Sequence, residues 1–189
     1  MLSEAEESEN GKKWYVLRDL KRANATTRAY QILQAHAEEL QIEVFTPLVK
    51  KVVIKSGKRE VREIPFIVDL LFVYADKAKF DAVIESMPLL QYRYSRGCKQ
   101  NDPMTVNDKE MSRFISISRG TERYNYYRPE EVSPSIYGRK VTIVGGTLDG
   151  LTGRLMTTRG SKTKRLIIEL PGLLALGVEV EAEYIKVEK

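Results

Sequence analysis

The sequence predicts an α+β chain with two folded parts, an N-terminal antiparallel sheet flanked by helices and a C-terminal SH3-like β-barrel. Between residues 12 and 118, aromatic and β-branched runs alternate with segments of helical periodicity, an order typical of an α/β sandwich. Residues 137–189 contain five short strand-like runs punctuated by glycine, which favour a small barrel. Residues 119–136 hold two prolines and no sustained period, so we predict a linker there.

The composition is typical of a cytoplasmic globular protein. Of the 189 residues, 42% are hydrophobic and 30% are charged, and no apolar run approaches the roughly 20 residues that cross a bilayer. The first ten residues hold four glutamates and no basic residue, so residues 1–11 are expected to be a disordered acidic tail rather than a secretory signal. The single cysteine, Cys98, excludes an internal disulfide and fits a reducing compartment.

Three elements open the N-terminal part. The aromatic and β-branched run Lys13–Arg18 predicts a first strand. A helix follows, with Thr26 or Thr27 as its cap, and Ile42–Phe45 then alternates as a second strand. The residues at helical spacing are Ala29, Ile32, Leu33, His36 and Leu40.

A charged hairpin and a hydrophobic strand come next. Val49–Ile54 and Arg59–Ile64 are strand-like runs of mixed charge, joined by a turn with a Ser-Gly pair. Because these runs have little apolar surface to bury, we expect the hairpin to project from the body. The run Val68–Tyr74 is the most hydrophobic strand candidate, which predicts a central position in the sheet.

Two helices and a strand complete the N-terminal part. We predict a helix over residues 76–86, a strand over Leu89–Tyr94 and a helix capped by Asn107. The apolar faces of the two helices carry Phe80, Val83, Ile84, Met111, Phe114 and Ile115.

The most specific motif of the C-terminal part is Arg139–Leu155. Gly145 and Gly146 allow the chain to reverse tightly, and Gly153 leaves space where a strand passes close to its neighbour. The run resembles a KOW motif, although an unrelated small barrel can share this glycine spacing. The leucine-rich residues 170–176 are also compatible with a helix.

The N-terminal part resembles the NusG family of transcription factors. The resemblance rests on Lys13–Val16 at the start of a strand, on the order of the elements, and on Met87–Tyr92. Pro65–Val73 stands where that family has an aromatic-Pro-Gly-Tyr strand, and Val68-Asp69-Leu70 here replaces Pro-Gly-Tyr. With the KOW part, the resemblance covers nearly the whole chain, with domains over residues 12–118 and 137–189.

The variant strand resembles UpxY-type specialised members of the family. Such members act as antiterminators on long operons for surface polysaccharide synthesis. The resemblance therefore implies a monomeric elongation or antitermination factor that binds RNA polymerase, restricted to such an operon. The alternative is a KOW-domain protein that binds RNA or the ribosome.

The resemblance also implies a polymerase site on the N-terminal domain. In this family an apolar depression receives the tip of the polymerase clamp helices, and such a pocket suits a partner's helix tip. Plain core packing is the alternative for the same residues. The corresponding positions are Phe66, Ile67, Leu70, Phe72, Tyr92 and Tyr94.

Nucleic acid is the second expected partner. The formal net charge is +5, and basic residues near the transcription bubble would neutralise phosphates of the non-template DNA strand. A solvated basic face is the alternative. The candidates are Arg18, Lys21, Arg22, Arg28, Arg93 and Arg96.

For the KOW domain, the resemblance implies a protein partner, either a small-subunit ribosomal protein or the termination factor Rho. An apolar patch near the motif loops is expected to carry that contact. Residues 159–165 form a basic loop that either touches nucleic acid or is a solvated hairpin tip, and a fold-switching barrel is known in one branch of the family. The patch candidates are Leu148, Leu151, Leu170 and Leu173.

Catalytic signals are weak. His36 is the only histidine and lies on a helical pattern, and Cys98 has no metal-ligand spacing around it. No Gly-rich phosphate loop with the required Lys-Ser/Thr is present. We expect no enzyme, no cofactor and no metal.

Overall fold

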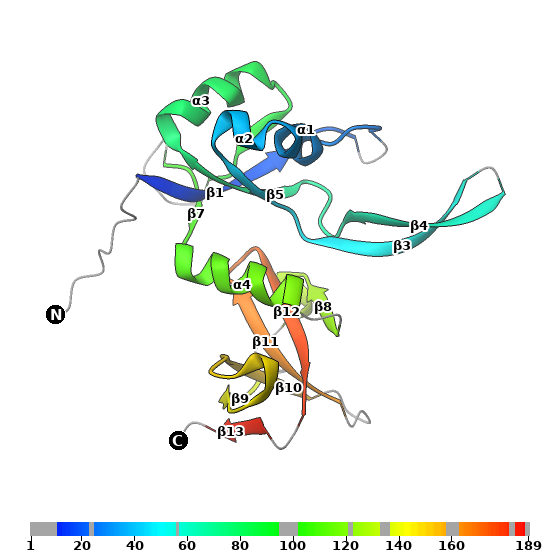
Figure 1. The fold of residues 1–189 in the computed structure, drawn as a ribbon, viewed down its shortest axis with the longest axis vertical. Helices are drawn as coiled ribbons and strands as arrows, with labels where there is room; N and C mark the ends of the chain where they lie inside the picture. The colour runs from blue at the N-terminus through cyan, green and yellow to red at the C-terminus, as the bar shows by residue number, and fades with distance from the viewer. Residues whose placement is uncertain are drawn as a thin grey trace. The chain divides into compact units, whose positions relative to one another are not determined.

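The computed structural model divides into two compact units, Met1–Asp108 and Lys109–Lys189 (Figure 1). The residues that the structure describes are 11–22, 25–55, 57–94, 102–120, 123–132, 137–157, 163–181 and 184–187.

Unit 1 is built on an antiparallel sheet. The sheet has the strand order β2-β5-β1-β6, and β7 also pairs with β1. The elements in chain order are β1 (Lys12–Asp19), α1 (Ala29–Ala35), α2 (Ala37–Leu40), β2 (Glu43–Phe45), β3 (Leu48–Lys55), β4 (Lys58–Pro65), β5 (Leu70–Asp76), α3 (Lys77–Ser86), β6 (Leu90–Tyr92) and β7 (Thr105–Val106).

The helices α1, α2 and α3 lie on the same side of this sheet (Figure 1). Alternation along β1 points Tyr15 and Leu17 toward that side, where they join a buried cluster with Leu33 of α1 and Phe80 of α3. The central position predicted for the hydrophobic strand is confirmed, because β5 lies between β2 and β1.

The strands β3 and β4 form the predicted hairpin, which extends away from the rest of unit 1 (Figure 1). Their register pairs Val52 with Val61 and Ile54 with Arg59. Gly57 has a φ of 76°, a left-handed conformation that glycine adopts without steric cost. At the base, the Phe66 N–H donates to the Pro47 carbonyl over 2.8 Å.

Unit 2 is dominated by one antiparallel sheet with the order β13-β9-β10-β11-β12-β8. Among the described residues this sheet does not close on itself, so the structure shows a β-rich unit compatible with the predicted barrel. Its elements are α4 (Asp108–Gly120, which starts at the last residue of unit 1), β8 (Tyr124–Tyr127), the 3-10 helix η1 (Pro129–Glu131), β9 (Tyr137–Ile143), the 3-10 helix η2 (Gly146–Leu148), β10 (Thr152–Thr157), β11 (Lys164–Leu170), β12 (Leu174–Val180) and β13 (Ile185–Val187).

The predicted linker differs most from the structure. Residues 119–136 include the end of α4, the strand β8 and a 3-10 helix. β8 pairs with β12, and Tyr126 of β8 stacks on Phe114 with ring centroids 6.2 Å apart. The prediction weighed the prolines and polar residues, whereas the alternating tyrosines supply enough apolar surface for an edge strand.

Smaller differences concern where elements begin. α1 starts after Arg28 rather than at a threonine cap, and its pattern is interrupted at His36. The leucine-rich segment is not a helix, because Gly172 with a φ of 70° forms a turn before β12. The predicted tail, residues 1–11, lies outside the described residues except for Gly11.

Candidate functional site

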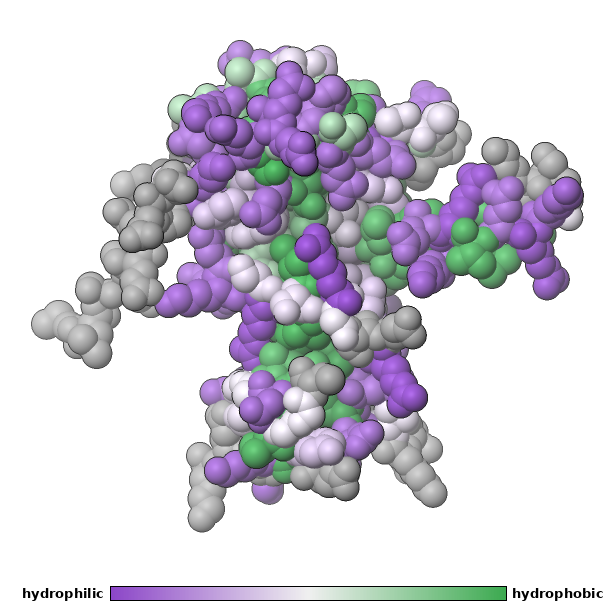
Figure 2. Space-filling view, viewed as in Figure 1, coloured by the Kyte–Doolittle hydropathy of each residue, from purple (hydrophilic) through white to green (hydrophobic). Residues whose placement is uncertain are grey.

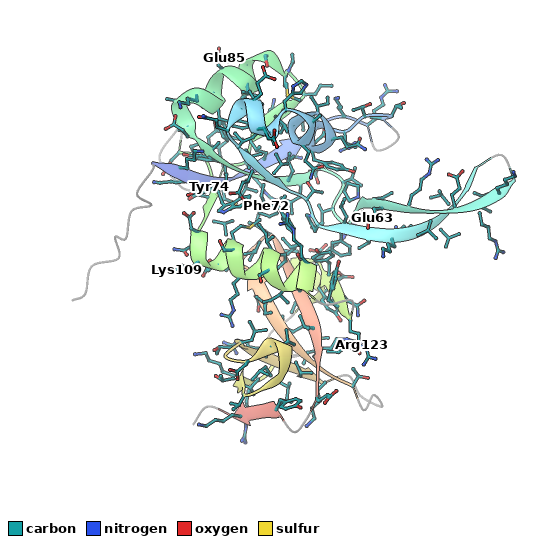
Figure 3. All side chains as sticks on the ribbon, in the orientation of Figure 1. Glu63, Phe72, Tyr74, Glu85, Lys109 and Arg123 are labelled. Atoms are coloured by element: carbon teal, nitrogen blue, oxygen red, sulfur yellow. The ribbon has the colours of Figure 1, made fainter. Side chains whose placement is uncertain are left out.

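The sheet of unit 1 has a second apolar face, opposite the one that the helices cover. Phe72 pairs with Val16 on one side and with Phe45 on the other, so alternation places all three on this face. The rings of Phe45 and Phe72 have centroids 6.1 Å apart, and those of Trp14 and Tyr74 are 5.4 Å apart. Phe72 and Tyr74 both extend from β5 (Figure 3).

Two of the predicted polymerase-binding residues, Leu70 and Phe72, belong to this second face. Both side chains are buried. Phe66 and Ile67 are half-buried in the turn that leads into β5. Tyr94, two residues beyond β6, is 53% exposed.

Tyr92 lies on the opposite face from Phe72. It pairs with Leu17 and packs in the helix-covered core, with its ring 5.5 Å from that of Tyr15. Its hydroxyl donates to Asp81 Oδ1 over 2.9 Å. Burial raises the pKa of the Tyr92 phenol, and the hydrogen bond to Asp81 raises it further. The six predicted residues therefore do not form one continuous surface.

Among the predicted DNA-binding residues, Arg28 has a structural position. Its side chain is 7% exposed and its Nε lies 3.1 Å from Oδ2 of Asp19, which is 3% exposed. The guanidinium also donates to three backbone carbonyls, those of Lys21, Arg22 and Val68. A guanidinium enclosed in this way is not available to a phosphate, so the assignment of Arg28 to DNA is corrected.

The remaining described cations are closer to solvent. Arg18 is exposed and forms an ion pair with Asp69, with 3.4 Å between Nε and Oδ2. Arg22 is exposed, and Arg93 is half-buried beside β1, where its N–H donates to the Val16 carbonyl. Lys21 Nζ donates to a backbone carbonyl nearby. Arg96 lies outside the described residues.

The predicted roles of the motif glycines in unit 2 are confirmed. Gly145 and Gly146 have φ values of 99° and 71°, which allow the tight reversal after β9. A Cβ atom on Gly153 would lie 2.6 Å from the Ile167 carbonyl oxygen, so only glycine fits the unaltered sheet there.

The predicted leucine patch of unit 2 is mostly interior. Leu151, Leu170 and Leu173 are buried, and Leu148 is half-buried. Of the basic loop, residues 163–165 are described, and Arg165 pairs with Glu179 over 3.1 Å. The rest of the loop lies outside the described residues.

No cluster of three or more His, Cys, Asp or Glu side chains suited to a metal is found within the described part of the chain. His36 Nδ1 lies 3.2 Å from Glu39 Oε2 at an exposed position, and Cys98 lies outside the described residues. In the same part of the chain, no helix is both long enough and apolar enough to cross a membrane.

Sequence reasoning missed Asp19 as an organising residue. Its Oδ1 accepts the Lys21 N–H over 3.0 Å and its Oδ2 accepts the Ala29 N–H over 2.9 Å. The only local signal is an acidic residue at the end of a strand, which does not indicate partners ten positions away.

Comparison with models of protein families places part of the chain in a known family. A family model described as "Transcription termination factor nusG" matches residues 12–115, which is more than half of the chain. No curated protein matches the sequence.

Proposed function

Because the chain belongs to the NusG family of transcription factors, we propose that it binds RNA polymerase through unit 1 and supports elongation or antitermination. NusG-family proteins are non-enzymatic transcription factors that typically interact with RNA polymerase. The mixed fold of unit 1, with helices on an antiparallel sheet, fits the N-terminal domain of that family.

The observation that carries the proposal is the second apolar face of the sheet. It gathers Leu70 and Phe72 with further buried aromatic side chains on one side of β5. Phe66 and Ile67 lie directly before this strand in a half-buried turn. Leu70 and Phe72 are themselves buried, so we assign the contact with a helix tip of the polymerase clamp to the half-buried Phe66 and Ile67 at the margin of this face.

Binding to the clamp would change transcription without a chemical step. A factor that holds the clamp closed favours the elongating polymerase over the paused one by its differential affinity for the two states. We also propose that four basic side chains contact phosphates of the non-template DNA strand at the transcription bubble. They are Arg18, Lys21, Arg22 and Arg93.

Unit 2 is proposed to be a KOW domain that binds a second protein. Its glycine turn and the close approach at Gly153 support this assignment. Leu148 is the accessible member of the predicted patch, and the proposed partner is a small-subunit ribosomal protein or Rho. A pull-down of each candidate with the full chain and a Leu148→Asp variant tests this contact.

The specialised role is a separate proposal. Asp69 is one of the three residues, Val68-Asp69-Leu70, that replace the family's Pro-Gly-Tyr. Its side chain forms an ion pair with Arg18, and its backbone carbonyl accepts the Asp19 N–H. These contacts hold the replaced residues in the turn before β5. We propose action on one operon for surface polysaccharide synthesis. Deletion of the gene followed by transcript profiling tests this, since uniform changes across many operons would contradict it.

Variants at the accessible margin of the site test polymerase binding. Leu70 and Tyr92 are unsuitable, because an aspartate at either position would bury a charge and unfold the unit. Phe66→Ala combined with Ile67→Asp should abolish co-purification with core polymerase and reduce readthrough of pause sites in vitro.

The matched control is Val144→Asp, which changes an exposed apolar residue of unit 2. It should retain polymerase binding. Circular dichroism checks that each variant is folded. Wild-type affinity in the folded Phe66/Ile67 variant would contradict the proposed site.

A further inference from the structure

The β3–β4 hairpin, residues 48–65 and hereafter the hairpin arm, carries most of the protein's net charge. It contains six lysines and arginines and two glutamates, a net charge of +4, against +5 for the whole chain. Concentrated positive charge on one projecting element is the electrostatic footprint of a polyanion-binding surface.

The shape of the arm suits a nucleic-acid groove. Its two strands are eight residues each, which makes the arm about 26 Å long. No third strand pairs with either of them in the described part of the chain. A two-stranded ribbon of this kind fits the major groove of B-DNA, which is about 12 Å wide.

One face of the arm combines apolar and cationic side chains. Alternation along β3 places Lys50, Val52 and Ile54 on this face. Their cross-strand partners in β4 lie on the same face and are Glu63, Val61 and Arg59. Val52, Val61 and Ile54 are 64%, 67% and 74% exposed. Figure 2 shows hydrophobic surface among hydrophilic residues along the arm.

The acidic residues of the arm leave its outer end positive. Glu60 is paired with Arg62 over 2.7 Å, and Glu63 lies toward the base of the arm (Figure 3). Lys58 and Arg59 therefore stand at the outer end without a carboxylate in the described ion pairs. Their ammonium and guanidinium groups match phosphates on the two rims of a groove.

We propose that the hairpin arm binds duplex DNA by inserting this face into the major groove. Val52, Ile54 and Val61 contact the groove floor, where thymine methyl groups offer apolar surface. Lys50 and Arg59 on the same face, and Lys58 beside the turn on the other face, reach the flanking phosphates. This goes beyond the proposed function, because the arm is separate from the proposed polymerase site and can be tested on DNA alone.

Binding of the full chain to a labelled 20-base-pair duplex, followed by fluorescence anisotropy over a salt series, tests the proposal. The variant Lys50→Gln/Lys58→Gln/Arg59→Gln should bind more than about tenfold more weakly at low salt, and its log K against log[salt] slope should be smaller in magnitude by about 2 to 3. The matched control Lys79→Gln/Arg139→Gln/Lys186→Gln removes three exposed cations elsewhere and should bind like the wild type.

Replacing the apolar residues separates groove insertion from simple charge attraction. Val52→Ser/Ile54→Ser/Val61→Ser should weaken duplex binding several-fold while the salt slope stays unchanged. Duplex RNA should bind more weakly than DNA, since its major groove is too deep and narrow for a ribbon.

Three results would overturn the proposal. They are equal loss of binding in the two charge variants, equal affinity for duplex RNA and DNA, and competition by polyglutamate as strong as by DNA. The last result would identify an acidic protein surface as the partner. Because polymerase is absent from these assays, their failure leaves the polymerase proposal unaffected.

Discussion

Asp19 and Arg28 form a buried ion pair that joins three parts of unit 1. Asp19 Oδ2 lies 3.1 Å from Arg28 Nε and also accepts the N–H of Ala29, the first residue of α1. Arg28 in turn donates to the Val68 carbonyl in the turn before β5. The pair therefore fixes the end of β1, the start of α1 and the entry to β5 relative to one another.

Loss of one partner should be strongly destabilising. Arg28→Ala leaves the Asp19 carboxylate buried without its counter-ion, and we expect the free energy of unfolding to fall by about 3–5 kcal/mol. Urea denaturation measures this. The neighbouring exposed Arg22→Ala should change the same quantity by less than about 0.5 kcal/mol. A similar small effect for both variants would show that the pair is not closed in solution.

Stability at alkaline pH should depend on Tyr92. Burial holds the pKa of its phenol above the ordinary value of 10.0, and the hydrogen bond to Asp81 adds to this. Above pH 10 the unfolded chain loses the phenol proton while the folded chain keeps it, so the stability contributed below pH 10 is lost as pH rises. Thermal melting from about pH 9 to about pH 11 should show a smaller decline in Tyr92→Phe than in the wild type. Tyr94→Phe, at an exposed position, should retain the wild-type decline.

The backbone of β11 passes so close to Gly153 that a larger residue at position 153 should destabilise unit 2. A Cβ atom there would lie 2.6 Å from the Ile167 carbonyl oxygen and 2.9 Å from Leu166 Cγ, so Gly153→Ala should destabilise unit 2 by about 1–3 kcal/mol. Faster amide hydrogen exchange in β10 and β11 would report the loss. Gly120→Ala has nothing within 4 Å and should leave these rates unchanged. Wild-type exchange rates in Gly153→Ala would contradict the packing.

The start of α3 depends on Asp76. Its Oδ1 accepts the Lys79 N–H over 3.0 Å, a side-chain cap of the first turn. Asp76→Ala should lower the free energy of unfolding by about 1 kcal/mol, whereas Asp76→Ser keeps an oxygen acceptor and should recover most of the loss. Chemical denaturation compares the two. Equal stability of both variants would show that the cap contributes nothing.

Strong local patterns made most of the fold of unit 1 predictable. β1, the hairpin arm, β5 and α3 carry periodic or aromatic runs that depend on few distant contacts. The strand β8 was not predictable, since an edge strand needs a partner and β12 lies about 50 positions further along the chain. Local sequence cannot show such a partner.

The candidate site was less predictable, because its faces depend on strand register. Phe72 and Tyr92 both read as aromatic strand residues, yet pairing with Val16 and Leu17 sends them to opposite faces. One position of register decides which face a side chain joins. The burial of Arg28 was equally hidden, since it depends on Asp19 and on Val68, forty positions away.

The pairing of β8 with β12 sets an order of events during synthesis. β8 leaves the ribosome some fifty residues before β12, so the edge of β8 that pairs with β12 stays unpaired until β12 has emerged. A nascent chain stalled before residue 174 would therefore display an incomplete sheet to chaperones and proteases. For the same reason, a fragment that begins at Tyr137 lacks the strand that pairs with β12, whereas a fragment that begins at Lys109 keeps it.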